Sequence, residues 1–220
     1  MSHLESFVTE NRKELFHKII EYRTRYITVV LEDIFQPHNA SAVLRTCDCF
    51  GIQDVHIIEN RNKYKVNPDV ALGSDKWLTL KKYRNARQNS IKAIEGLKKK
   101  SYRIVATSPH KKGVDVNNFD IAAGKFALVF GTELQGLTPD ILDRADEFIS
   151  IPMFGFTESF NISVSAAIIL HTLVVRLHES GIDWKMKPDE KNKVLISWFK
   201  TSVKRSDLIE KSFRLGKGCL

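Results

Sequence analysis

Cysteine is scarce in this chain, with three residues in 220. Cys47 and Cys49 are separated by one residue, and Cys219 is next to the last position. An odd and sparse set excludes a disulfide framework, and the spacing lacks the second Cys or His pair that a zinc site needs. We therefore expect no bound metal. We also expect Cys47 and Cys49 to be buried, reduced thiols, because both lie in an apolar segment.

Long hydrophobic runs are missing as well. The longest apolar stretch, residues 166–175, is interrupted by His171 and Thr172, and it falls short of the roughly 20 residues that a membrane span requires. The first residues lack the basic and then apolar regions of a secretory signal. We therefore expect a soluble, cytoplasmic protein. Glycine (11) and proline (6) are too few for a collagen-like chain, and a hydrophobic share of 43% excludes a disordered one.

The apolar runs that are present are short, nearly continuous and rich in β-branched or aromatic residues. They predict strands buried on both faces, at residues 26–31, 55–58, 103–106, 126–130 and 148–151. Helical patterns separate them, at residues 39–50, 90–100, 139–145 and 161–179. This alternation predicts an α/β fold: a mostly parallel sheet with helices on both faces, over residues 26–180. Residues 1–25, with an amphipathic pattern over 4–22, and residues 181–220, with helical patterns over 189–202 and 207–215, are expected to be helical extensions.

Positive charge is unevenly spread along the chain, whose formal net charge is +8. Residues 60–103 hold 13 Lys and Arg against 3 Asp and Glu, and residues 181–220 hold 10 against 5. Aromatic and basic residues alternate at 63–65 and 81–84, as on a surface that binds nucleic acid. Ordinary solvated helix faces are the alternative explanation.

A glycine-rich turn follows the strand predicted at 126–130. Gly131, Thr132, Glu133 and Gly136 have the glycine spacing of a phosphate-binding loop, but Leu137 replaces the lysine that would reach the phosphates. The chain also lacks the G-x-G-x-x-G pattern of nicotinamide-binding folds. Nucleoside triphosphate hydrolysis and hydride transfer are therefore disfavoured. Either a plain turn or close approach of the backbone to another ligand fits this turn.

Two further stretches join a strand end to a helix. Residues 149–155 lead to Ser159 and Asn161, either of which could cap the apolar helix that follows. That helix is apolar around most of its circumference, so it is central to the core or part of a subunit interface. Asn39 could cap the helix predicted at 39–50, which contains Arg45. A buried Arg45 would need an anion; pairing with Asp48 or extension into solvent are the alternatives.

Taken together and in order, these stretches resemble the three motifs of the SPOUT methyltransferases of the SpoU type. The resemblance covers about residues 26–180. It implies a deep trefoil knot at the C-terminal end of the sheet, an exception to the rule that folds are unknotted. It also implies a site for S-adenosylmethionine formed by backbone groups of three loops. Carried over, the contact residues are Ala106, Thr107, Gly131, Ile151, Met153 and Phe160. Relatives usually carry Leu where this chain has Phe160.

The resemblance assigns activation of a ribose 2′-hydroxyl to Arg45. A free guanidinium is a poor base, so either an RNA phosphate holds and desolvates it or it stabilises a developing alkoxide. Asn39, Glu133, Ser159 and Asn161 are expected to position Arg45, the substrate and the loops. The resemblance implies no metal. It implies a homodimer in which the last apolar helix packs across the two-fold axis and the Arg45 of one subunit completes the site of the other.

The resemblance, together with the helical extensions at both ends, implies tRNA as the substrate, with guanosine 18 in the D-loop as the expected target. Methylation of ribosomal RNA or of the tRNA wobble nucleotide remains an alternative with the same chemistry. A non-catalytic RNA-binding protein is the alternative from another class.

Overall fold

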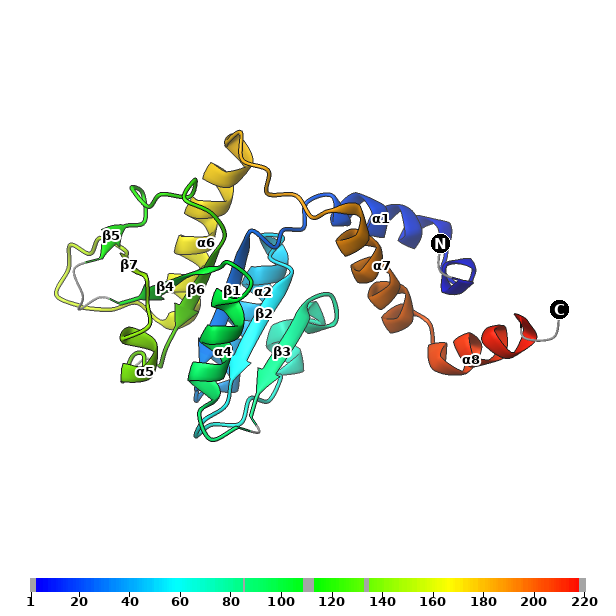
Figure 1. The fold of residues 1–220 in the computed structure, drawn as a ribbon, viewed down its shortest axis with the longest axis horizontal. Coiled ribbons are helices and arrows are strands. Elements are labelled where there is room, and N and C mark those ends of the chain that lie inside the picture. The colour runs from blue at the N-terminus through cyan, green and yellow to red at the C-terminus, as the bar shows by residue number, and fades with distance from the viewer. Residues whose placement is uncertain (1–2, 85, 109–112, 133–134, 218–220) are drawn as a thin grey trace. The chain divides into compact units, whose positions relative to one another are not determined.

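The computed structural model describes residues 3–84, 86–108, 113–132 and 135–217. The chain forms two compact units. One is Thr24–Trp184, and the other combines Met1–Arg23 with Lys185–Leu220. We call them the sheet unit and the terminal unit (Figure 1).

The sheet unit is built on a seven-stranded sheet in the order β3-β2-β1-β6-β4-β7-β5. Every pairing between these strands is parallel. The parallel α/β fold predicted from the sequence is therefore confirmed. The strands are β1 (Ile27–Glu32), β2 (Asp54–Ile58), β3 (Thr79–Tyr83), β4 (Arg103–Thr107), β5 (Val114–Asp115), β6 (Phe126–Phe130) and β7 (Glu147–Ser150).

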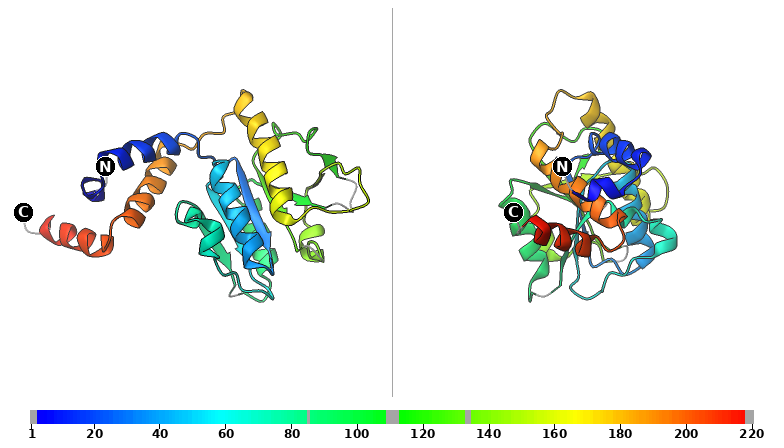
Figure 2. Two further views of the ribbon diagram at one scale, coloured as in Figure 1. Left: turned by 180° about the vertical axis from the view of Figure 1, so that it is seen from behind. Right: turned by 90° about the vertical axis from the view of Figure 1, so that its right-hand side faces the viewer.

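Helices cover both faces of this sheet. Seen from behind, α2 and α6 lie side by side over one face, while α4 and α5 lie over the other (Figures 1 and 2). A short helix and a 3-10 turn, α3 and η2, precede β3. The bounds are α2 (Pro37–Cys49), α3 (Pro68–Ala71), η2 (Ser74–Lys76), α4 (Asn89–Lys98), α5 (Pro139–Leu142) and α6 (Ile162–Glu179).

The central strands bury side chains toward both helix layers. In β1, Val29 and Leu31 pack into the cluster under α2 and α6, and Val30 packs into the cluster under α4 and α5. In β6, Leu128 and Val129 divide in the same way. Successive strand residues point to opposite faces, so a strand covered on both sides needs an unbroken apolar run. This explains why these strands were readable from the sequence.

Three expectations need correction. The sequence reading missed β3 and β5: β3 exposes Lys81 and Lys82 at the sheet edge, and β5 has only two residues. Cys49 is exposed while Cys47 is buried, because helix residues two positions apart in sequence lie about 160° apart around the axis and so face nearly opposite sides. The amphipathic pattern over 4–22 corresponds to a 3-10 turn and a separate helix rather than to one helix.

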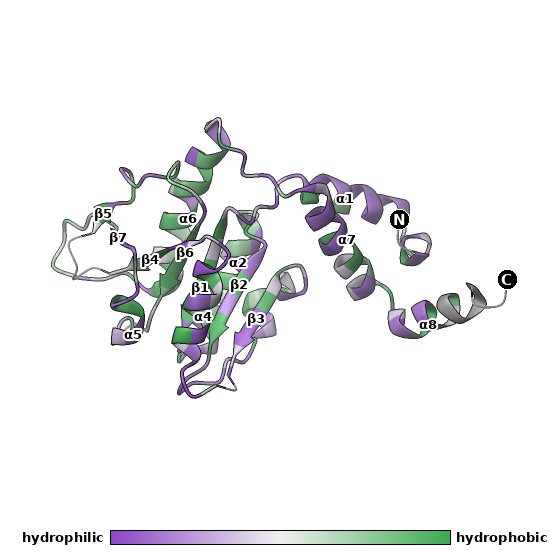
Figure 3. Ribbon diagram, viewed as in Figure 1, coloured by the Kyte–Doolittle hydropathy of each residue, from purple (hydrophilic) through white to green (hydrophobic). Residues whose placement is uncertain are grey.

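Both ends of the chain contribute to the terminal unit. The Phe16 ring centroid lies 5.4 Å from that of Trp198 and 5.6 Å from that of Phe199. Lys191 and Glu21 form an ion pair at 2.6 Å. Apolar residues of α1 and α7 therefore share one core, while much of their remaining surface is hydrophilic (Figure 3). The elements are η1 (His3–Phe7), α1 (Glu10–Ile20), α7 (Pro188–Ser202) and α8 (Ser206–Lys217).

Within the described ranges, α6 is the one helix long and apolar enough to cross a membrane by length and composition. Leu170, Leu173 and Leu177 of this helix are fully buried in the core of the sheet unit. The core helix of a soluble protein passes the same criterion, so this helix does not indicate a membrane protein.

A buried histidine lies beside the edge strand. His56 of β2 is 5% exposed, and its Nδ1 is 2.9 Å from the hydroxyl of Tyr83. Burial, followed by the positive charges of Lys81 and Lys100, lowers the pKa of His56 to about 4. The imidazole is therefore neutral in the folded protein at neutral pH.

This histidine should make the fold sensitive to acid. In the unfolded chain His56 has its ordinary pKa of about 6.5, so below that pH the unfolded state binds the proton more readily. The free energy of unfolding should therefore fall as the pH drops from about 6.5 toward 4, by on the order of 3 kcal/mol for this group. His56→Gln should flatten that slope, as measured by urea unfolding between pH 4.5 and 7. His38→Gln removes an exposed imidazole and is the control; equal slopes in the two variants would contradict the prediction.

Candidate functional site

The carboxyl ends of the parallel strands meet at one edge of the sheet, and a cavity of about 290 Å³ lies there. The loops after β4, β6 and β7 and the first turns of α6 line this main cavity. In open α/β sheets ligands bind at this edge. Among its lining residues are Thr107, Gly131, Ile151, Met153, Ser159 and Phe160.

The turn after β6 requires glycine at its start. Thr132 and Gly136 exchange backbone hydrogen bonds at 3.0 Å, which brings Gly136 across Gly131. A Cβ on Gly131 would lie 2.3 Å from the carbonyl carbon and oxygen of Gly136, a distance that real Cβ atoms do not show. The backbone can therefore close this turn against the cavity only without a side chain at 131. Glu133, also assigned to the site from the sequence, lies outside the described residues.

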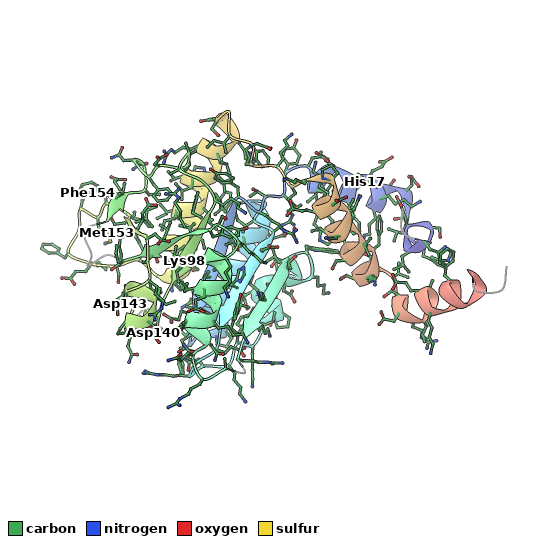
Figure 4. The ribbon with its side chains drawn as sticks, in the orientation of Figure 1. His17, Lys98, Asp140, Asp143, Met153 and Phe154 are labelled. Atoms are coloured by element: carbon green, nitrogen blue, oxygen red, sulfur yellow. The ribbon has the colours of Figure 1, made fainter. Side chains whose placement is uncertain are left out.

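A long loop leads from β7 to α6 and forms another wall. Ile151 and Met153 line the main cavity near its start, and Ser159 and Phe160 line it near its end. Between them Phe154 and Phe156 project away from the protein, with 99% and 108% relative exposure. Met153 and Phe154 lie on this loop as it runs outside the sheet (Figure 4). The loop thus contacts the cavity at both ends and exposes large apolar side chains at its middle.

A second cavity of about 320 Å³ adjoins the first. The two cavities share Thr132, Gln135 and Ile162 in their walls. The other lining residues of the adjoining cavity come from the segments after β1 and β2 and from α2: Ile34, Phe35, Gln36, Asn39, Arg61 and Asn62. Two ligand groups could therefore lie next to each other at this edge of the sheet.

Two asparagines from distant motifs meet between these walls. The Asn161 side-chain amide donates to Asn39 Oδ1 at 3.2 Å across 122 residues of sequence. Asn161 also caps α6, because its Oδ1 accepts a hydrogen bond from the backbone N of Ser163 at 2.8 Å. The expected capping role of Asn39 is wrong: α2 begins at Pro37, and Asn39 is a buried residue of its first turn. Its amide instead donates to Gln36 Oε1 at 3.1 Å.

Arg45 lies apart from this pair. It is exposed and lines neither cavity. Arg45 follows Asn39 by six residues, which places the two positions about 120° apart around the helix axis. None of the ion pairs in the described part of the chain includes Arg45, so of the open alternatives extension into solvent is the one observed, and not pairing with Asp48.

The two predicted residues at the end of β4 differ in their placement. Ala106 is fully buried against the α4 side of the sheet and does not line the main cavity. Thr107 lines the cavity, and its hydroxyl donates to the carbonyl of Val129 at 2.9 Å. The end of β4 is thereby tied to β6.

Buried carboxylates hold the loops around the adjoining cavity. Glu32, 1% exposed, accepts from the backbone N and the hydroxyl of Thr138 at 2.9 and 2.7 Å. Asp33 adopts a φ of 53°, and its Oδ1 accepts from the backbone N of Asn60 and Arg61 at 2.7 and 2.8 Å. Sequence reasoning assigned no role to these acids. The available signal was their position at the carboxyl end of a buried strand, and Arg61 and Asn62 give a similar signal because they lie in the segment that follows β2.

Comparison with known proteins identifies the family. The family model described as the SpoU rRNA Methylase family matches residues 26–171. The chain belongs to this family. It is 45% identical over 207 residues to the tRNA (guanosine(18)-2'-O)-methyltransferase of Borreliella burgdorferi, covering 94% of this chain and 93% of that protein.

Solved structures of the SpoU family share the fold. A TrmH/SpoU tRNA modifying enzyme of Aquifex aeolicus aligns with a TM-score of 0.78 at 31% identity, covering 89% of this chain and 98% of that one. The SpoU methyltransferase AviRb of Streptomyces viridochromogenes, solved in complex with AdoMet, aligns with a TM-score of 0.59 at 22% identity over 75% of this chain and 62% of that one. The latter likeness concerns the fold alone. The family match spans the three loops around the main cavity.

The close approach at Gly131 gives a test of this wall. Gly131→Ala should lower the free energy of unfolding by roughly 1–3 kcal/mol, because the added methyl group overpacks against the Gly136 backbone. Gly155→Ala is the matched control, since a Cβ there meets no atom within 4 Å. Urea unfolding of the three proteins measures both effects. Equal stability of Gly131→Ala and wild type would contradict the requirement for glycine.

Proposed function

We propose that this protein methylates the 2′-hydroxyl of a ribose in tRNA, at guanosine 18 of the D-loop, using S-adenosylmethionine. The observation that carries the proposal is the 45% identity, over almost the full length of both chains, to a protein named for this reaction. Two adjoining cavities at the carboxyl edge of the sheet supply room for a methyl donor and for the accepting nucleotide.

The main cavity suits S-adenosylmethionine by its chemistry. Apolar side chains such as Met153 and Phe160 offer surface for a flat base, and hydroxyls such as those of Thr107 and Ser159 offer polar contacts. The glycine-dependent turn at Gly131 brings the backbone close to the cavity. We propose that these residues, with Ile151 and the backbone at Ala106, hold the donor. When bound, it supplies a methyl group activated by a positive sulfonium.

We propose that this chain's polar residues hold the acceptor in line with the donor. The hydrogen bond between Asn39 and Asn161 ties the adjoining cavity to the start of α6. Ser159 and Glu133 would complete the positioning. Because a methyl transfer depends on alignment more than on acid or base strength, we propose that no metal takes part.

Arg45 is proposed to act on the 2′-hydroxyl across a homodimer interface. Its exposure and its separation from the cavities of its own chain support action in a partner's site. Val164 and Val175 of α6 are 43% and 40% exposed, which supports packing of this helix against a second copy.

Three broader assignments belong to the same proposal. We propose that residues 26–180 form the catalytic domain, flanked by the helical extensions 1–25 and 181–220, and that its C-terminal part forms a deep trefoil knot. The family membership and the loop between β7 and α6 support this. We propose a cytoplasmic location, where tRNA is modified.

Removing the guanidinium tests the role of Arg45. Arg45→Ala should lower methyl transfer to a tRNA transcript by at least about a hundredfold, the scale of a lost acid or base group, while tRNA and S-adenosylmethionine still bind. Transfer of labelled methyl and calorimetry measure the two effects. Arg144→Ala is the control, because Arg144 lines neither cavity and loses only local contacts with Asp140, a hydrogen bond to its carbonyl at 3.1 Å and an ion pair at 3.8 Å. Unchanged transfer by Arg45→Ala would overturn its assignment.

Mixing two inactive variants tests action across the interface. If Arg45 serves the partner's site, a dimer of one Arg45→Ala and one Asn161→Ala subunit has one intact site, and mixing should restore part of the activity. If each subunit uses its own Arg45, both sites carry a lesion and mixing restores nothing.

Mapping the methylated nucleotide in tRNA from a deletion strain tests the target. If the deletion strain instead lacks a methyl group at the wobble position or in ribosomal RNA, that nucleotide is the target and the assignment to guanosine 18 is wrong.

A further inference from the structure

A third hollow lies between β3 and α4, with a volume of about 420 Å³. It shares no lining residue with the main or the adjoining cavity. Five of its lining residues are cations and one is an acid: Lys81, Lys82, Arg84, Lys92, Lys99 and Glu95. We call this hollow the basic groove. Hydrophilic residues cover much of β3 beside it (Figure 3).

The groove runs along one face of α4. Asn89, Lys92, Gly96 and Lys99 all line it, at steps of three and four residues. This spacing keeps them in one row on a helix, while Ala93, Ile94 and Leu97 face the core. At a rise of about 1.5 Å per residue, Lys92 and Lys99 lie roughly 10 Å apart along the helix axis. The row is therefore long enough for a chain of charges and not only for a single ion.

The cations of the groove lack acidic partners in the described ranges of the chain. None of the five belongs to an ion pair found there, although Glu95 lies among them. Lys98, one residue from Lys99, behaves differently and pairs with Asp146 at 2.7 Å. Gathering unpaired like charges raises the electrostatic energy, and a polyanion would relieve it.

Tyr83 on the β3 side of the groove is held in place, and Gly96 on the α4 side, which forms its floor, leaves open space. The Tyr83 ring stacks on His56 and its hydroxyl is bonded to that imidazole, while Lys81 Nζ lies 5.0 Å from the Tyr83 centroid. Gly96 occupies the interior of α4, where glycine is a poor helix former. A Cβ at Gly96 would meet no atom within 4 Å, so packing does not require glycine there. Its missing side chain leaves space in the groove.

We infer that the basic groove binds the phosphodiester backbone of RNA, outside the nucleotide that is methylated. The identification of that RNA as the substrate tRNA rests on the proposed function. Unpaired cations on both walls of the groove, Lys81 on β3 and Lys92 and Lys99 on the α4 side, can contact several phosphates of one strand, and the bare helix surface at Gly96 permits a close approach. Lysines on an exposed edge strand also discourage aggregation. That explains Lys81 and Lys82 but neither the row on α4 nor Gly96.

Neutralising three cations tests the groove. Lys81→Gln/Lys92→Gln/Lys99→Gln should raise the Kd for tRNA at least about tenfold near 0.15 M salt and reduce the slope of log K against log salt by roughly 2 to 3. The matched control is Lys76→Gln/Lys98→Gln/Lys125→Gln, which removes the same charge outside the groove lining. Filter binding to tRNA transcript at several salt concentrations measures both. Equal weakening in the two triple variants, or none in the first, would overturn the inference.

A charge-neutral variant separates shape from charge. Gly96→Gln fills the floor of the groove and should raise the Kd for tRNA several-fold with the salt slope retained. Calorimetry with S-adenosylmethionine should give the wild-type Kd for every groove variant, because the groove lies outside the main cavity. Size-exclusion chromatography checks the edge-strand explanation. If the groove variants bind tRNA normally but form new aggregates, the inference is overturned and the lysines serve to protect the edge strand.

The outcomes also separate this inference from the proposed function. If the wild-type protein binds tRNA through the groove cations but transfers no methyl group, the proposed function is contradicted while the inference about the groove is supported. Normal transfer to guanosine 18 by the groove triple variant, with the KM for tRNA unchanged, would do the reverse. The expected result is a raised KM for tRNA with kcat retained, because the groove contacts no reacting atom.

Discussion

The pairing of β1 with β6 is the constraint on which the site depends. These strands are about a hundred residues apart in sequence, yet their parallel register runs from Ile27 opposite Phe126 to Leu31 opposite Phe130. With that register, the segment leading to Asn39 and the turn at Gly131 leave the sheet at the same edge. A slip by one residue would exchange the side chains that face the two helix layers, so the close fit of particular side chains in the two core clusters holds the register.

The sequence predicts those parts of the fold that depend on hydrophobic pattern alone. Strands β1, β2, β4 and β6 were readable because both of their faces are buried. The edge strand β3 was not, since exposed lysines interrupt its pattern and its strand character comes from pairing with β2. Two-residue β5 depends entirely on its pairing with β7. Such strands are set by tertiary contacts that a local pattern does not contain.

In the candidate site, too, some features can be predicted from the sequence and others depend on tertiary contacts. Glycine at 131 signalled a close backbone approach, and the structure supplies the reason in the Gly136 carbonyl. The contact between Asn39 and Asn161 could not be read from spacing, because it depends on how α2 and α6 cross. The sequence shows two acids, Glu32 and Asp33, at the end of a strand. Their role in holding loops from other strands follows only from the three-dimensional arrangement.

The terminal unit has a consequence for the order of events during synthesis. Helix α1 leaves the ribosome early, but Phe16 of this helix packs against Trp198 and Phe199 of α7, which are made about 180 residues later. At typical elongation rates that delay is roughly ten to thirty seconds. The sheet unit can fold in this interval, whereas the packing of α1 against α7 forms only after α7 has been made. The two units of the chain can therefore complete their packing at different times during synthesis.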